Sequence, residues 1–167
     1  GCCNAYGLKL DYAFTQPVGK DARSYSGKFG VELFLDYIAL IHDCAKAAKP
    51  EAIISASPCH PLFTNYVDHA RLHDYYPDLR RCYEEFTFRR EIYDIAMPGV
   101  LFDTDGSAHN SRRDTMRYMR LAPKIGIPDL YCITEFPSLT LSDDDWESVA
   151  DIWREYGELI DRTVGKE

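Results

Sequence analysis

Short apolar stretches and longer amphipathic stretches alternate along this chain of 167 residues. The apolar stretches are bounded by glycine, proline or polar clusters, which predicts strands. Five strands are expected, at residues 7–13, 52–57, 69–73, 99–106 and 129–136. The segments between and after them carry apolar residues at helical spacing. Helices are expected at residues 28–48, 78–97, 111–122 and from 142 onward.

Two of these helices also have recognisable start signals. Asn110 or Ser111 can cap the third helix. Ser142 and Asp145 stand three residues apart before the fourth helix, which is the spacing of a capping box. These signals fix where the two helices begin.

Nearly continuous apolar strands separated by helices predict an α/β fold with a parallel sheet covered on both faces. Carboxylates stand at or just after the carboxyl ends of four of the five predicted strands. They are Asp11, Asp74, Asp103 with Asp105, and Glu135. A (β/α) barrel or an open parallel sheet keeps its chemistry at this end of the strands.

A complete (β/α)8 barrel needs about 250 residues, and this chain supplies five strands. We therefore expect strands 4 to 8 of a TIM-type barrel, in one domain over residues 1–167 that is incomplete at its N-terminal side. Three arrangements are compatible with this length. Upstream strands are missing, or the five units form an open sheet, or two chains complete each other.

The stretch GLKLDYAF, residues 7–14, places two charged residues in an otherwise apolar strand. Lys9 and Asp11 are two positions apart, so their side chains point to the same face. A nearby ammonium keeps a carboxylate ionised, as a carboxylate nucleophile requires. Asp11 is the first catalytic candidate, and a salt bridge to Lys9 without catalysis is the alternative.

This Lys-x-Asp strand resembles that of clan D glycoside hydrolases, the melibiase-type α-galactosidases and their α-glucosidase-type relatives. In that clan the nucleophile ends barrel strand four and the acid/base follows strand six. The resemblance implies that Asp11 is the nucleophile, that Lys9 contacts the substrate and that Asp74 is the acid/base of a retaining enzyme. In such an enzyme the two carboxyl groups lie about 5 to 5.5 Å apart. The sugar and the linkage stay open.

Further polar residues near the predicted strand ends are candidates for binding sugar hydroxyls. They are His73, Asp103 and Glu135, each with a structural or solvated role as the alternative. For Asp74 the alternative is a place at the start of the next helix. Alternation puts Arg71 on the face opposite Asp74, which predicts a buried ion pair between Arg71 and a helix.

Two other functions fit parts of the sequence. The chain is alternatively a non-catalytic carbohydrate-binding or assembly fragment. The stretch VLFDTDGS also resembles the first motif of haloacid-dehalogenase-type phosphohydrolases. That resemblance implies Asp103 as nucleophile, Asp105 as acid/base and a magnesium ion.

The composition of the chain limits the classes of molecule that it is expected to bind. The net charge of −8 and the pI near 5.1 argue against a nucleic acid or an anionic membrane. The expected partners are a carbohydrate substrate and either a missing barrel half or a second copy. Six cysteines without ligand-like spacing predict buried reduced thiols, so no metal or cofactor is expected. The first residues lack the charged and apolar regions of a signal peptide, which favours the cytoplasm unless the natural chain is longer.

Overall fold

The computed structural model describes residues 5–11, 21–57, 60–72, 79–104, 111–130 and 140–164. These residues form an α/β fold with four strands and four α-helices. The strands are β1 (Gly7–Leu10), β2 (Ile53–Ala56), β3 (His69–Arg71) and β4 (Leu101–Asp103). The helices are α1 (Val31–Ala48), α2 (Leu79–Ala96), α3 (Arg112–Leu121) and α4 (Asp143–Val164). Two short 3₁₀ helices are η2 (Pro61–Phe63) and η3 (Ala122–Lys124).

The strands form one parallel sheet in the order β1-β2-β3-β4, so each strand lies beside its successor in the chain. The register pairs Leu8 with Ile54 between β1 and β2. A single parallel bridge then joins Asp103 of β4 to Ile127. The predicted α/β class and the parallel pairing are confirmed, whereas a closed barrel stays a prediction.

The described residues group into two compact units, and the expectation of a single domain stays a prediction. The first unit comprises Gly1–Arg71 and Tyr93–Leu101, the second Leu72–Ile92 and Phe102–Glu167, each in its described parts. In the described helices none is long and apolar enough to span a membrane.

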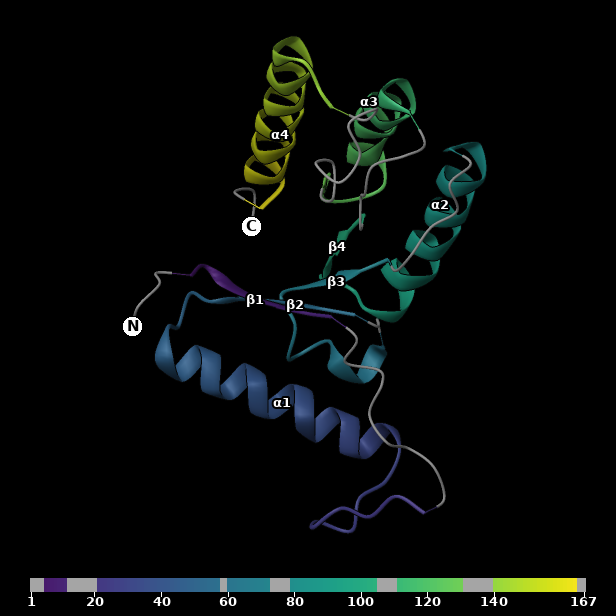
Figure 1. Ribbon diagram of the computed structural model, residues 1–167. Coiled ribbons are helices and arrows are strands. Elements are labelled where there is room, and N and C mark those ends of the chain that lie inside the picture. Colours follow the sequence, from purple (N-terminus) through teal and green to yellow (C-terminus); the bar gives the residue numbers. More distant parts are fainter. Residues whose placement is uncertain are drawn as a thin grey trace. The chain divides into compact units, whose positions relative to one another are not determined.

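In the first unit, α1 runs along the strands β1 and β2 (Figure 1). Phe34 of α1 meets Phe63 of η2 edge to face, with ring centroids 5.0 Å apart. Lys46 near the end of α1 donates to both carboxylate oxygens of Asp68 at 3.0 Å, and Asp68 also accepts the Ile54 amide at 2.7 Å. Burial opposes ionisation, but these hydrogen bonds prevail and lower the pKa of Asp68. The contacts hold α1 to the sheet.

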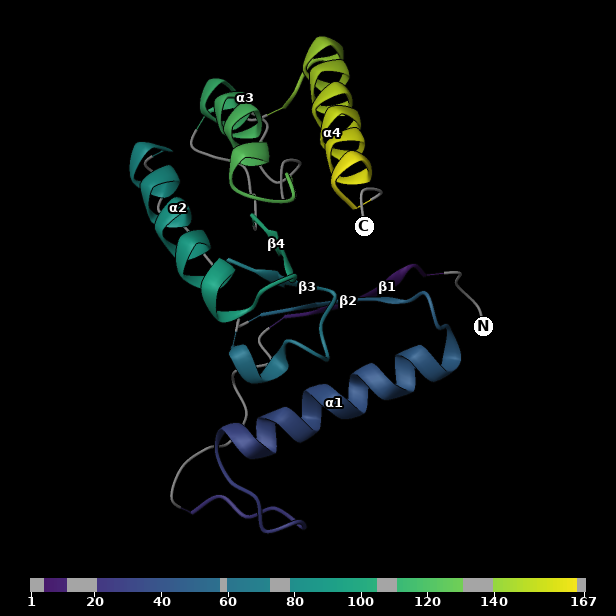
Figure 2. The same ribbon diagram turned by 180° about the vertical axis from the view of Figure 1, so that it is seen from behind.

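In the second unit, α3 and α4 lie side by side, as Figures 1 and 2 show from opposite directions. Trp153 of α4 donates its indole N–H to the carbonyl of Pro128 at 2.7 Å. Arg90 of α2 donates to the carbonyl of Ile125 at 2.7 Å. Large side chains fill the core between these elements. They include Phe86, Phe102, Tyr118, Met119 and Val149, all at most 1% exposed.

Helix starts follow the predicted caps at both later helices. Ser111 caps α3, because its hydroxyl accepts the amide of Asp114 at 3.2 Å. The capping box of α4 is formed in both directions, since the Ser142 amide donates to Asp145 at 2.8 Å and the Asp145 amide donates to the Ser142 hydroxyl at 3.3 Å. The capping predictions are confirmed.

Some predicted boundaries differ from the structure for backbone reasons. The first helix begins at Val31 rather than at residue 28, because Gly27 and Gly30 have φ angles of 74° and 60°, outside the helical region. It ends at Ala48 because Lys49, which precedes Pro50, is extended. Most of the strand predicted at 129–136 lies outside the described residues.

Candidate active site at the strand ends

A polar face runs across the first three strands of the sheet. The register places Lys9 of β1 opposite Ser55 of β2, and Ser55 opposite His69 of β3. Residues paired in this way have side chains on the same face. Ser55 is only 5% exposed, whereas Lys9 is exposed. The neighbouring residues of each strand point the other way, so the sheet carries polar side chains on one face.

The same alternation continues to the carboxyl ends of the strands. Asp11 follows β1, Ser57 follows β2 and Arg71 ends β3. Each is two positions beyond one of the polar residues above, so the three share their face. A guanidinium nitrogen of Arg71 donates to a carboxylate oxygen of Asp11 at 2.9 Å. The ion pair joins the ends of the first and third strands.

Arg71 reaches Asp11 across the intervening strand. Neighbouring strands lie about 4.8 Å apart, so β1 and β3 are separated by roughly twice that distance. Only a long side chain bridges such a gap, and Ser57 on the strand between is small enough to leave room. Arg71 is 4% exposed, whereas the carboxylate of Asp11 is 56% exposed. The buried guanidinium therefore orients a carboxylate that remains open to solvent.

This arrangement adds a strand-end partner to the one predicted for Arg71. The sequence predicted a buried ion pair between Arg71 and a helix. Arg71 is buried and its described ion pair is with Asp11 at the end of a strand, so a helix partner stays a prediction. The contact with Asp11 arises from register. Lys9 and His69 lie in the same row of the sheet, so Asp11 and Arg71, two residues later, share the next row.

Asp103 ends β4 and is described with the second unit. Its side chain is buried, with 6% of the residue exposed, and its carbonyl accepts the amide of Leu72 at 2.9 Å. The next residue, Thr104, is fully buried and fixes this strand end. Its hydroxyl donates to the carbonyl of Ile127 at 2.9 Å, and its carbonyl accepts the hydroxyl of Tyr118 at 2.8 Å. The buried position of Asp103 does not favour attack on a phosphate.

Of the six predicted site residues, the structure describes Lys9, Asp11 and Asp103. The other three, His73, Asp74 and Glu135, lie outside the described residues, as does Asp105 of the dehalogenase-like motif. The separation of the Asp11 and Asp74 carboxyl groups therefore stays a prediction, as do the binding roles of His73 and Glu135.

Ser55 and Ser57 were not among the site residues predicted from the sequence. Both are at least 95% buried, and the hydroxyl of Ser55 has no hydrogen-bond partner in the part of the chain that the structure describes. Their spacing of two residues within AIISAS was the available signal, because it puts both hydroxyls on one face of the strand. They add small polar groups to the face of the sheet that carries Lys9 and Asp11.

No group of metal-binding side chains is present among the described residues. Cys82 is buried as expected, but Cys44 is exposed on α1, so the prediction of buried thiols is wrong at that position. Comparisons with family models, with curated proteins and with solved structures found no match to this chain.

Proposed function

We propose that this chain is the C-terminal part of the catalytic barrel of a retaining glycosidase that acts on α-glycosides. Asp11 is the nucleophile and Asp74 the acid/base. The observation that carries the proposal is the Asp11 carboxylate, which stands open to solvent at the carboxyl end of a parallel strand while a buried arginine orients it. Parallel α/β folds place their reacting groups at this position.

The strand order supports a barrel. Doubly wound sheets reverse the order of their strands at a switch point, whereas a (β/α)8 barrel places every strand beside its successor. The order β1-β2-β3-β4 has no reversal, and the bridge from Asp103 to Ile127 continues it. We assign these strands to positions 4 to 7, with the segment after Ile127 leading into strand 8. The preceding strands come from upstream sequence or from a second chain.

The reaction has two steps. A carboxylate oxygen of Asp11 attacks the anomeric carbon, the bond to the leaving oxygen breaks, and Asp74 gives its proton to that oxygen. Water then loses a proton to Asp74 and attacks the same carbon, which releases the sugar and the Asp11 carboxylate. Arg71 holds the carboxylate in place, and Lys9, on the same face, contacts the sugar. No cofactor takes part in either step.

The test is covalent trapping by a 2-deoxy-2-fluoroglycosyl fluoride of α-configuration, screened over common hexoses and followed by intact mass. The proposal expects one added fluorosugar, mapped by peptide sequencing to Asp11 and absent in Asp11→Asn. Asp43→Asn is the matched control, because Asp43 is an exposed carboxylate on α1 and its substitution leaves labelling unchanged. Labelling elsewhere, or equal labelling of Asp11→Asn, contradicts the assignment.

A second candidate is a non-catalytic carbohydrate-binding fragment, which the ion pair of Asp11 favours because a paired carboxylate can accept sugar hydroxyls without attacking. Saturable binding of a hexose by calorimetry, with no covalent label on any residue, supports this candidate over the enzyme.

A further inference from the structure

Two neighbouring cavities lie along α3, η3 and α4 in the second unit. One has a volume of about 520 Å³ and the other of about 540 Å³, and Arg120 lines both. We call them together the α3–α4 groove. Its basic side chains are Arg112, Arg113, Arg120, Lys124 and Arg162, and its acidic ones are Asp145 and Glu155. The groove is thus positive on a chain whose net charge is −8.

The acidic side chains leave much of this charge uncompensated. Arg112 is bound to Asp145, and Arg162 donates to Glu158 at 3.4 Å. In contrast, the side chains of Arg120 and Lys124, which line the same cavity, form no hydrogen bond or ion pair with any residue in the described ranges. Two cations therefore line this cavity, and no carboxylate of the described residues is bound to either of them. A dianion fits them, since a guanidinium binds two oxygens at once and an ammonium adds a third contact.

The cavity of about 520 Å³ also has an apolar wall. Pro123 of η3 and Ile152 and Leu159 of α4 line the same cavity as Arg120 and Lys124, together with the ring of Tyr156. Leu159 is 51% exposed, so an apolar group that covered it would remove that surface from water. The groove combines a cationic end with an apolar wall.

We propose that the α3–α4 groove binds a phosphate monoester carried on a ring. The phosphate is bound by Arg120 and Lys124, and the ring lies against Ile152 and Leu159. The site is formed by residues other than those of the proposed glycosidase site, so it does not depend on that function.

The experiment is an NMR titration of the whole chain with phenyl phosphate, in parallel with inorganic phosphate and phenol. We expect saturable binding of phenyl phosphate, with the largest methyl shifts at Ile152 and Leu159. Inorganic phosphate binds more weakly, because it lacks the ring, and phenol does not bind. Binding is at least about tenfold weaker in the double variant Arg120→Gln, Lys124→Gln, since it loses two charge-assisted contacts.

Arg154→Gln is the matched control. Arg154 is exposed on α4 and bound to Asp151, and it does not line the groove. Binding by this variant stays within about twofold of the wild type, because distant surface charges contribute little in salt. Arg120 and Lys124 are exposed, so both variants keep the fold, which circular dichroism checks. The proposal is overturned by an absence of saturable binding, by methyl shifts elsewhere, by equal binding of inorganic phosphate, or by equal losses in the double variant and Arg154→Gln.

Discussion

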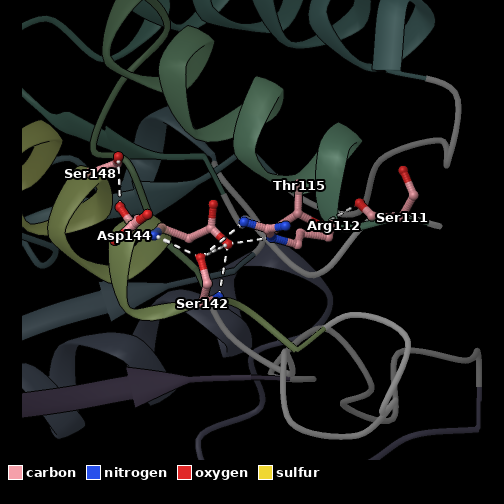
Figure 3. A network of polar contacts seen from close by, with 7 residues as sticks. Ser111, Arg112, Thr115, Ser142, Asp144 and Ser148 are labelled. Carbon is pink, nitrogen blue, oxygen red and sulfur yellow. Dashed lines mark hydrogen bonds and ion pairs between the residues drawn. The ribbon is translucent and has the colours of Figure 1, made fainter.

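Replacing Asp145 by Asn removes one charge from the network at the start of α4, shown in Figure 3. Arg112 of α3 donates to the Asp145 carboxylate and also to the hydroxyl of Ser142 at 2.9 Å. The hydrogen bond from Arg112, aided by the amide and hydroxyl of Ser142, lowers the pKa of Asp145 from 3.8 to about 2. Asn keeps an oxygen that accepts the Ser142 amide, so the variant chiefly measures the charge.

The magnitude follows from the pKa difference. A lowered folded-state pKa stabilises the fold at every pH above the unfolded value, and the effect is lost as the pH falls toward the folded value. The full difference corresponds to about 2 kcal/mol. Because Arg112 is 52% exposed, solvent screening reduces the expected cost of Asp145→Asn to about 1 kcal/mol at pH 7. About half of that cost remains near pH 3, and roughly a sixth near pH 2.

The assay is urea unfolding followed by tryptophan fluorescence. The chain has two tryptophans, Trp146 and Trp153, and both belong to α4, so the signal reports on the unit that contains the network. Asp151→Asn is the control, since Asp151 forms an exposed pair on the same helix and its loss costs at most about 0.5 kcal/mol. A cost of Asp145→Asn that is the same at pH 7 and pH 3, or no larger than that of the control, shows that the Asp145 charge is not what stabilises the fold.

Three further predictions concern other parts of the fold. Gly126→Ala is expected to cost at least about 2 kcal/mol in urea unfolding, because its new Cβ would lie 2.2 Å from a carbonyl oxygen of β4; a stability equal to wild type would contradict the close approach. Asp68→Asn is expected to cost about 1 kcal/mol or less of unfolding free energy at pH 7, since Asp68 is 40% exposed and bound to Lys46. The cost should decrease below pH 4 because the pKa of Asp68 is lowered. An unchanged cost at low pH would exclude the Asp68 charge as its cause. The amide of Gly7 points away from β2, so its hydrogen exchange measured by NMR should be faster than that of the β2 amides unless another strand covers this edge.

Patterns within short segments were sufficient to predict most helices and strands and the parallel pairing of the strands. The capping box at Ser142 and the cap at Ser111 depend only on residues three positions apart, and the structure contains both. The start of α1 was missed by three residues because helical spacing does not reveal backbone conformation. Gly27 and Gly30 adopt positive φ angles there, which glycine permits. The spacing of apolar residues does not reveal these angles.

The site was only partly predictable, because its main contact depends on register. That Asp11 and Lys9 share a face follows from alternation within one strand. The contact between Arg71 and Asp11 depends on two strand pairings and on the small side chain of Ser57 between the two residues. The sequence of a single segment does not specify these pairings. The place of Ser55 in the polar face could not be predicted for the same reason. A serine within an apolar stretch belongs to that face only because the register pairs it with Lys9 and His69.

The buried position of Arg71 determines which experiments on Asp11 are informative. A guanidinium that is 4% exposed requires acceptors, and Asp11 supplies one of them whether or not it attacks a sugar. Asp11→Ala is therefore expected to lower stability under either function, so a loss of activity in that variant does not identify a nucleophile. Asp11→Asn retains an oxygen for Arg71 but cannot form the ester intermediate. A catalytic carboxylate is distinguished from one that only forms an ion pair with a buried arginine by two results together. The Asp11→Asn variant must remain stable, and it must not form the covalent label.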